Sequence, residues 1–287
     1  MEKKLILRGV IAGAIGGLLA FVFARIFAES QIQAAIDYES GRDDAQMLLD
    51  KATGLTVEEM GPDIFSRTIQ ANIGIGVGMI LFGVAMGAMY AVVYTVCLGR
   101  VGKIRARTLA VLVAAGGFLA FNLVPYLKYP ANPPAIGHPE TIGDRSALYL
   151  VMVGCSLLFL VLAVWVGKKL QPRFGNWNAT LIAAGGFIVA IGIVMALLPS
   201  LGELAANVTQ YGDQATETPL PLLDAKGTII YPGFPADVLS KFRLYSIIAQ
   251  VILWTTMALV FAPMADKLLA PLTRSTRTGD PTTPVSA

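Results

Sequence analysis

Two stretches, Ala147–Val166 (ALYLVMVGCSLLFLVLAVWV) and Ala179–Leu198 (ATLIAAGGFIVAIGIVMALL), contain no acidic or basic side chain. An α-helix rises 1.5 Å per residue, so each stretch is long enough to cross a hydrocarbon layer of roughly 30 Å. A helix on the surface of a soluble protein would carry charge along its exposed face. The sequence therefore predicts an all-α, polytopic membrane protein with six transmembrane helices, the other four being Leu5–Phe27, Ile73–Leu98, Leu109–Leu127 and Leu244–Ala262.

The overall composition supports this class. Hydrophobic residues make up 55% of the chain and charged residues only 14%, whereas a soluble domain has roughly 25% charged residues. The chain has one histidine, no HExxH motif and no serine-centred nucleophile elbow, so we expect no enzyme. It also lacks the exposed basic surface of a nucleic-acid-binding protein. Cys97 and Cys155 both fall within apolar runs, which excludes a disulfide framework in the loops.

Lysine and arginine concentrate in alternate connections. The segments 99–108 and 167–178 hold basic residues and no acid, and Lys3, Lys4 and Lys267 flank the first and last runs. The positive-inside rule places these segments and both termini in the cytoplasm of a bacterium, with the chain passing several times through its inner membrane. The other three connections would face outward, and they hold most of the acids: Asp37, Glu39, Asp43, Asp44, Glu58, Glu59, Asp63, Glu140, Asp144, Asp213 and Asp237.

A sequence pattern recurs along the chain. Gly16–Phe21 (GGLLAF) resembles Gly116–Phe121 (GGFLAF), and an arginine precedes each helix that would return to the cytoplasm: Arg67, Arg145 and Arg243. One interpretation is a membrane domain of residues 1–267 made of three repeated hairpins (5–98, 108–167 and 179–264), followed by a flexible cytoplasmic tail, 268–287. The other is that Gly-Gly pairs recur because helices pack closely at small residues.

Asn122 is one of the few polar residues within an apolar run, and Pro125 follows it closely. Proline has no N–H to donate, so the carbonyl of Phe121 would lose its helical partner. An amide oxygen beside a free carbonyl could bind a cation that has lost part of its water. The alternative is that Asn122 bonds to a neighbouring helix and Pro125 simply ends the run.

A proline-rich segment, Lys128–Arg145, follows. It carries His138, with Glu140 and Asp144 nearby. Imidazole and carboxylate ligands together suit a borderline divalent metal such as cobalt or nickel. One histidine with two acids is also common in ordinary loops, where Asp144 could pair with Arg145 or cap the next helix. With Asp37, Glu39 and Asn122, these residues are the candidate metal ligands.

The opening Leu7–Phe21 (LRGVIAGAIGGLLAF) with Ile36–Glu39 (IDYE), and the central Asn122–Pro134 (NLVPYLKYPANPP), resemble the CbtA family. The resemblance implies a membrane subunit of cobalt uptake that works with CbtB, a small single-span subunit bearing several histidines. It implies Co²⁺ as the transported ion and no tightly bound cofactor. A histidine-bearing partner would supply nitrogen ligands that this chain lacks.

The main hypothesis is entry of Co²⁺ driven by the membrane potential. Its mouth would comprise the Pro125–Arg145 loop, the Asp37/Glu39 segment and the Tyr231-Pro232 loop, with Tyr129, Pro130 and the three arginines as structural or gating residues. One alternative is a non-transporting scaffold that packs against partner helices. Another is a carrier of a small anion or organic solute, with Arg67, Arg145 and Arg243 facing one centre. The bilayer is a certain partner, and the sequence leaves a homo-oligomer open.

Overall fold

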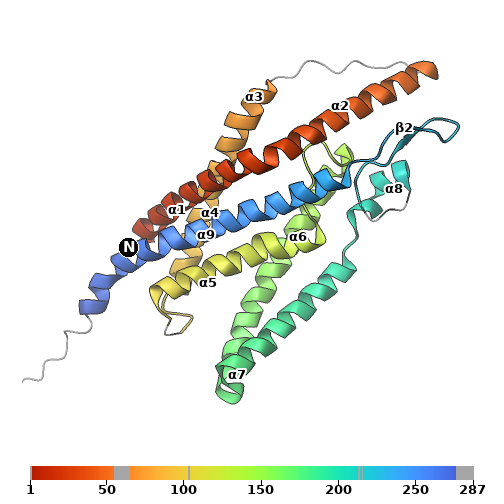
Figure 1. The fold of residues 1–287 in the computed structure, drawn as a ribbon. Coiled ribbons are helices and arrows are strands. Elements are labelled where there is room, and N and C mark those ends of the chain that lie inside the picture. The colour runs from red at the N-terminus through yellow and green to blue at the C-terminus, as the bar shows by residue number, and fades with distance from the viewer. Residues whose placement is uncertain (1, 55–64, 103, 213, 215, 276–287) are drawn as a thin grey trace, which may run out of the picture. The chain divides into compact units, whose positions relative to one another are not determined.

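Long helices dominate the computed structural model, which describes residues 2–54, 65–102, 104–212, 214 and 216–275 (Figure 1). Seven charged residues counted above lie outside these ranges: Glu58, Glu59, Asp63, Lys103, Asp213, Arg277 and Asp280. The elements are α1 (Glu2–Phe23), η1 (Ala24–Ala28), α2 (Glu29–Ala52), α3 (Arg67–Ile69), η2 (Gln70–Gly74), α4 (Ile75–Cys97), α5 (Ala106–Phe118), η3 (Leu119–Leu123), α6 (Val124–Lys128), η4 (Pro139–Thr141), α7 (Ile142–Leu197), η5 (Leu201–Glu203), α8 (Ala205–Tyr211), β1 (Leu222–Leu223), β2 (Ile229–Tyr231) and α9 (Ala236–Ser275).

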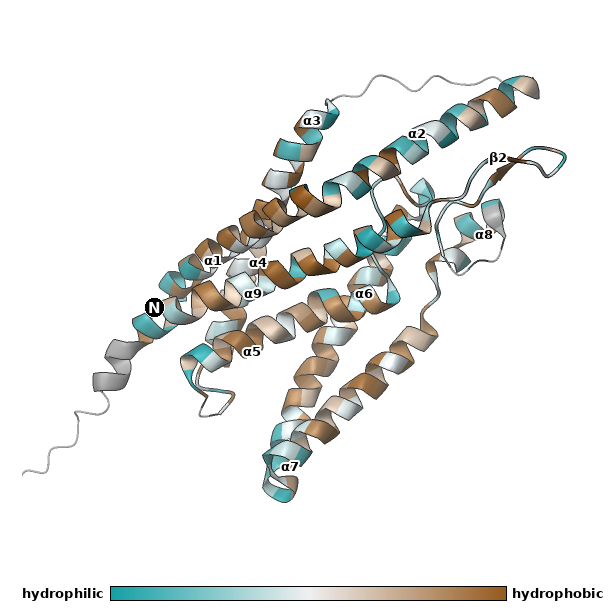
Figure 2. Cartoon of the chain, in the orientation of Figure 1, coloured by the Kyte–Doolittle hydropathy of each residue, from teal (hydrophilic) through white to brown (hydrophobic). Residues whose placement is uncertain are grey.

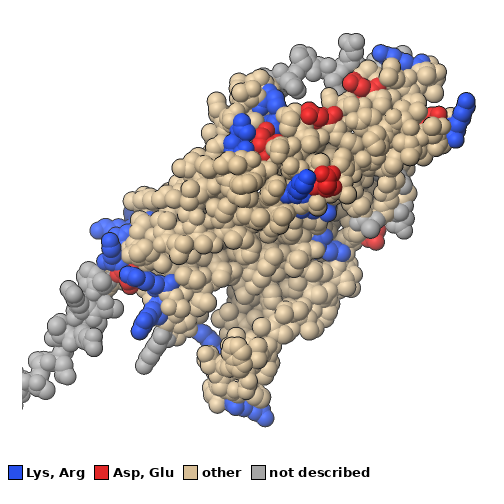
Figure 3. Space-filling model, viewed as in Figure 1, with Lys and Arg blue, Asp and Glu red and all other residues tan. Residues whose placement is uncertain are grey.

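Five helical stretches within the described residues are long and apolar enough to cross a membrane: Glu2–Ala52, Arg67–Cys97, Ala106–Lys128, Pro139–Gln210 and Ala236–Leu269. Their faces are largely uncharged, as the broad tan areas of Figure 3 show. This confirms an all-α membrane protein with several apolar helices. The chain is a multi-pass membrane protein.

The helix α7 turns back on itself. Gly175 has φ 74° and ψ 171°, a conformation outside the helical range, and Pro172 lies just before it. Figure 1 shows the two arms of α7 meeting at this turn, and each arm holds one of the two apolar runs quoted above. Glycine adopts a positive φ without the steric cost of a Cβ atom, so the sequence places the turn at the residue best able to make it.

The connection Ala28–Asn72 differs from the loop that the sequence led us to expect. Helix α1 continues through the π-helical turn η1 into α2, which ends only at Ala52. This stretch has no proline, and Ala and Gln, which favour helices, are among its commonest residues, so nothing stops the helix where the apolar residues end. Figure 2 shows the change from mostly brown in α1 to a mixture with teal in α2.

The connection after α7 and the segment after Lys267 also contain secondary structure that was not expected. Helix α9 begins at Ala236, before the predicted start at Leu244, and it continues to Ser275, beyond Lys267. Strands β1 and β2 form a small antiparallel hairpin. The Asp224 carboxylate accepts hydrogen bonds at its turn from the backbone N–H groups of Thr228 and Lys226, each at 2.8 Å, and these bonds lower its pKa.

The packing divides the chain into two units. Unit 1 comprises Met1–Phe21, Ile73–Gly117 and Val251–Ala287, and unit 2 comprises Val22–Asn72 and Phe118–Gln250.

Glycines bring α1 and α4 into backbone contact within unit 1. A Cβ atom added at Gly13 would lie 2.0 Å from the Gly83 carbonyl oxygen, and one added at Gly87 would lie 2.2 Å from that of Gly9. No real Cβ atom approaches an oxygen so closely, so these helices could not pack in this way with larger residues. Small residues therefore allow close helix packing here.

Aromatic side chains fill the rest of unit 1. The rings of Tyr90 and Tyr94 meet Phe261 edge-on, with centroids 4.9 and 5.0 Å apart. The hydroxyl of Tyr90 donates to the Ala110 carbonyl at 2.8 Å, which ties α4 to α5.

Unit 2 has two apolar clusters. The first is centred on Val124, Tyr129, Met152 and Ile191, from α6, the segment after it and both arms of α7. The second cluster joins three segments that are far apart in the sequence: Ala35 and Tyr38 of α2, Ile136 of the proline-rich segment, and Tyr231 and Phe234.

We expect Gly87→Ala to lower the stability of the purified protein by about 1–3 kcal/mol, because the added methyl group forces α1 and α4 apart. Gly78→Ala is the matched control on the same helix, since a Cβ atom there meets nothing within 4 Å. Thermal unfolding in detergent should show a lower midpoint for Gly87→Ala and an unchanged or higher one for Gly78→Ala. Equal midpoints would contradict the close packing.

Candidate functional site

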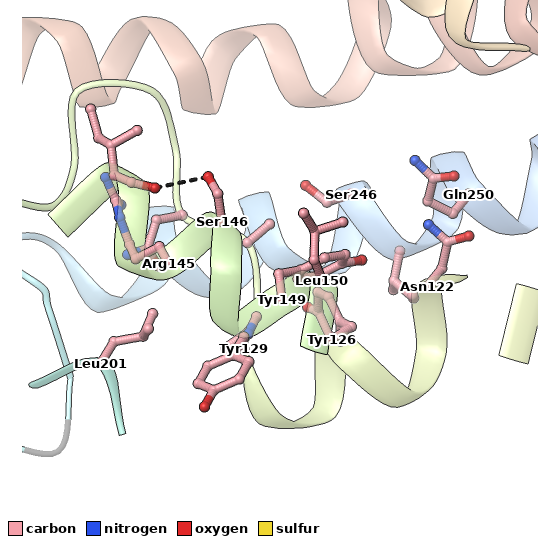
Figure 4. A pocket seen from close by; sticks show the side chains of 15 residues that line it. Asn122, Tyr126, Tyr129, Arg145, Ser146, Tyr149, Leu150, Leu201, Ser246 and Gln250 are labelled. Carbon is pink, nitrogen blue, oxygen red and sulfur yellow. Dashed lines mark hydrogen bonds between the residues drawn. The ribbon is translucent and has the colours of Figure 1, made fainter. Parts of the chain in front are cut away.

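A cavity of about 610 Å³ lies wholly within unit 2. Its size is that of a typical small-molecule site. Figure 4 shows Arg145 at one end and Asn122 with Gln250 at the other. The lining comes from η3, α6, the segment after α6, α7, η5 and α9: Asn122, Tyr126, Tyr129, Pro130, Ala131, Asn132, Ile142, Arg145, Ser146, Tyr149, Leu150, Leu201, Ser246, Ile247 and Gln250.

The polar groups of the lining are nearly all neutral. They are the amides of Asn122, Asn132 and Gln250, together with serine and tyrosine hydroxyls. Asn122 is buried, with 8% of its surface exposed. The Ser146 hydroxyl donates to the Ile142 carbonyl at 2.8 Å, the bond dashed in Figure 4. Arg145 is the one lining side chain among the described residues that carries a charge.

The structure around Pro125 differs from what the cation-binding hypothesis predicts. The carbonyl of Phe121 accepts a hydrogen bond from the Tyr149 hydroxyl at 2.9 Å. The helix also widens into the π-helical turn η3 just before Pro125. Because a side chain of α7 satisfies this carbonyl, the expectation of a free carbonyl next to Asn122 is wrong, and the amide of Asn122 is the polar group that remains at the cavity.

Tyr129 and Pro130 lie where α6 ends and the proline-rich segment begins, and both line the cavity. The Tyr129 hydroxyl donates to the Pro199 carbonyl at 2.9 Å. Burial raises the pKa of Tyr129, and the negative charge of Glu203 raises it further, so this hydroxyl stays protonated as a donor.

Arg145 forms an ion pair with Glu217, with Nη1 and Oε2 3.2 Å apart. The Glu217 side chain is fully buried, with 0% of its surface exposed. Its Oε1 accepts hydrogen bonds from the backbone N–H of His138 at 3.3 Å, from Asn207 Nδ2 at 3.2 Å and from the Thr141 hydroxyl. The sequence interpretation missed Glu217, because a glutamate between two threonines in a long connection gives no local signal.

The other two predicted arginines also hold segments in place. Arg243 of α9 donates to the Ala131 carbonyl at 3.2 Å and to Asn132 Oδ1 at 2.9 Å, so it fixes two residues of the cavity lining. Arg67 pairs with Glu29 and donates to Gln33 Oε1 at 3.2 Å, both on α2. Each arginine therefore has partners of its own in the structure.

The candidate metal ligands are not gathered into one centre. His138 Nδ1 accepts a hydrogen bond from the backbone N–H of Glu140 at 3.2 Å and so caps the short helix η4. The side chains of Glu140 and Asp144 are exposed. Within the described ranges no group of three or more His, Cys, Asp or Glu side chains is placed to hold a metal ion.

The acids of α2 lie beside the second apolar cluster. Tyr38, between Asp37 and Glu39, donates its hydroxyl to the Pro232 carbonyl at 2.8 Å and packs against Tyr231 with ring centroids 5.3 Å apart. The carboxylate of Asp37 accepts a hydrogen bond from Gln33 at 2.8 Å. The structure thus brings the Asp37/Glu39 segment, the proline-rich segment and the Tyr231-Pro232 loop into contact.

Comparison with known protein families finds a match over nearly the whole chain. The model of the CbtA family, described as a probable cobalt transporter subunit, matches residues 2–266. This chain belongs to the CbtA family. No curated protein and no solved structure matches it.

The CbtA match covers the cavity, the α2 acids and the five long helices, the last of them as far as Asp266. It confirms the resemblance to the CbtA family noted in the sequence. The family's description links the geometry given above to probable cobalt transport. A transporter subunit acts with other components, and several apolar helices require a lipid bilayer as surroundings.

We expect Tyr149→Phe to destabilise the protein by roughly 1–3 kcal/mol, since it removes the hydroxyl group that donates a hydrogen bond to the Phe121 carbonyl. Tyr126→Phe is the matched control, because no hydrogen bond of the Tyr126 hydroxyl is found among the described residues. Thermal unfolding of both variants in detergent measures the difference. A midpoint for Tyr149→Phe equal to that of Tyr126→Phe would refute this role.

Proposed function

We propose that this chain is the membrane subunit of a cobalt uptake system in the bacterial inner membrane and that it lets Co²⁺ enter the cell. The observation that carries the proposal is the match of residues 2–266 to a family of probable cobalt transporter subunits. The cavity supports it, because a polar cavity built on apolar helices is what a solute needs within a bilayer. The chain itself catalyses no reaction in this proposal.

Six crossings with both termini in the cytoplasm are the proposed topology. The two arms of α7 count as separate crossings because the helix turns at Gly175. Basic residues at the α7 turn, between α4 and α5 and at the start of α1 would then face the cytoplasm. In this arrangement three hairpins repeat, and each returning helix has its arginine at the outward end: Arg67, Arg145 and Arg243.

The proposed route begins at the outward acids. Asp37 and Glu39, with His138, Glu140 and Asp144, would raise the local concentration of cations near the mouth. Co²⁺ would pass on into the cavity, where the amide oxygens of Asn122, Asn132 and Gln250 can accept hydrogen bonds from water that the ion retains. The three arginines hold the surrounding segments, and Tyr129, Pro130, Tyr231 and Pro232 shape the mouth.

The membrane potential is the proposed driving force. An inside-negative potential favours entry by about 2.3 kcal/mol per charge per 100 mV, hence by about twice that for a dication. A partner subunit with several histidines would complete the system, because this chain holds one histidine. Nitrogen ligands suit cobalt, and the partner would supply them.

A second candidate function is a carrier of a small anion or organic solute. One observation favours it: the charged group in the described cavity lining is the guanidinium of Arg145, which would attract an anion. The arginines do not support it as a set, because Arg67 and Arg145 are each paired with a glutamate.

Labelled cobalt uptake tests the main proposal. Cells that express this chain with its histidine-bearing partner should accumulate more labelled Co²⁺ than cells that express either subunit alone, and dissipating the membrane potential should abolish the difference. Accumulation no higher than in cells with an empty vector would remove the proposal. Uptake of a labelled carboxylate without any uptake of Co²⁺ would favour the anion carrier.

Uptake should also fall as the external pH is lowered. Burial raises the pKa of Glu39, and the nearby charge of Asp43 raises it further; burial likewise raises the pKa of Asp43. A raised pKa means that these carboxyls become protonated, and lose their attraction for Co²⁺, at a higher pH than exposed carboxyls do. Uptake by a Glu39→Gln, Asp43→Asn variant should therefore depend less on pH.

Asp50→Asn, a carboxylate further along the same helix, is the control for this experiment, because its charge contributes to neither of the two raised pKa values. It should keep the pH dependence of the original chain. A double variant whose uptake falls with pH as steeply as that of the control would show that Glu39 and Asp43 do not attract the ion.

A further inference from the structure

The positive charge on the cavity wall disfavours a cationic substrate unless a negative charge balances it. Arg145 lines the cavity, and about a quarter of its side chain is exposed. No carboxylate lines the cavity within the described part of the chain. A guanidinium is always protonated, so by itself Arg145 would repel a dication and attract anions.

Glu217 supplies the balancing charge from behind this wall. Its side chain has no exposed surface and does not line the cavity, so it cannot serve as a surface ligand in this conformation. Its Oε2 accepts no hydrogen bond and lies 3.2 Å from Arg145 Nη1, while Oε1 accepts all three hydrogen bonds described above. One oxygen thus fixes the carboxylate, and the other faces the guanidinium.

The other described charges near the lining do not balance the charge of Arg145. Arg243 adds a second positive charge, bound to Ala131 and Asn132. Glu203 lies near Tyr129, but its side chain is exposed and accepts a hydrogen bond from the backbone N–H of Ser200 at 2.9 Å. Water screens an exposed carboxylate far more than a buried one. Among the acids that the structure describes, Glu217 is therefore the one whose loss would change the cavity potential most.

We propose that Glu217 determines the charge selectivity of the cavity: by neutralising Arg145 it allows a divalent cation to enter a chamber that would otherwise select anions. This inference rests on the proposed function, and it adds a residue and a sign of charge that the family match does not give. Arg145 is kept beside the cavity because it holds Glu217 and the segments bonded to it.

Charge-neutral substitutions separate this role from a structural one. Glu217→Gln keeps an oxygen for the bonds from His138, Thr141 and Asn207 but leaves Arg145 unbalanced. The double variant Arg145→Gln, Glu217→Gln removes both charges and so gives the surroundings of the cavity the same net charge as in the original chain, although it loses the ion pair. If Glu217 only held the segments together, the double variant would be at least as impaired as the single one.

The experiment measures labelled Co²⁺ uptake by cells that express the chain with its partner, normalised to the amount of folded protein in the membrane. We expect Glu217→Gln to reduce uptake roughly tenfold or more, since an uncompensated unit charge acts on a dication across a few ångströms of poorly polarisable protein. The double variant should return to within about twofold of the original chain. Glu203→Gln, which removes an exposed acid from the same connection, is the matched control and should leave uptake unchanged.

Three outcomes would overturn the inference. Uptake by Glu217→Gln equal to that of the original chain would show that the charge of Glu217 does not matter. A double variant as impaired as the single variant would assign Glu217 a structural role only. Uptake by the original chain no higher than with an empty vector would remove the proposed function and this inference together, whereas the first two outcomes leave the proposed function standing.

Discussion

Apolar surroundings offer no water to a main-chain carbonyl that has lost its helical partner, and this constraint explains much of the structure. Tyrosine hydroxyl groups donate hydrogen bonds to such carbonyls. Tyr149 donates to Phe121 before Pro125, and Tyr129 donates to Pro199 where α7 has ended. Each bond satisfies an acceptor and also joins two segments, because the donor comes from a different helix or loop. Tyrosine suits this task, since its ring packs among apolar groups while its hydroxyl reaches a polar one.

Two kinds of contact hold the segments together, and both units use charged side chains for the second kind, as Arg107 does with Asp266 in unit 1. In unit 1 the main chains of α1 and α4 meet directly at Gly9, Gly13, Gly83 and Gly87, so the contact depends on side chains being absent. In unit 2 charged and polar side chains from one segment bind the backbone or carboxylate of another, as Arg145 does with Glu217. The first kind of contact tolerates no added atom. The second leaves space between the segments, and the cavity lies in that space.

The sequence was a good guide where one residue or one run decides the outcome. Long runs without charge predict long apolar helices, and the predicted connection 167–178 contains Gly175, where α7 turns. Asn122 was a candidate metal ligand, and Arg145, Tyr129 and Pro130 were candidate structural or gating residues; all four line the cavity, and their roles stay predictions. The partners of these residues could not be predicted. Glu217 is far from Arg145 in the chain, and only the folded connection brings them together; for the same reason the Tyr149 hydroxyl at Phe121 was not foreseen.

The hydrogen bonds of Arg243 limit which residues can replace it. Two separate nitrogens of one planar group reach two acceptors on consecutive residues, Ala131 and Asn132. Lysine would keep the positive charge, but its single ammonium nitrogen lacks that planar, two-pronged geometry. In a comparison of natural variants, retention of charge at this position would therefore be a poor guide to retention of the cavity wall. The two hydrogen bonds depend on the shape of the guanidinium as well as on its charge.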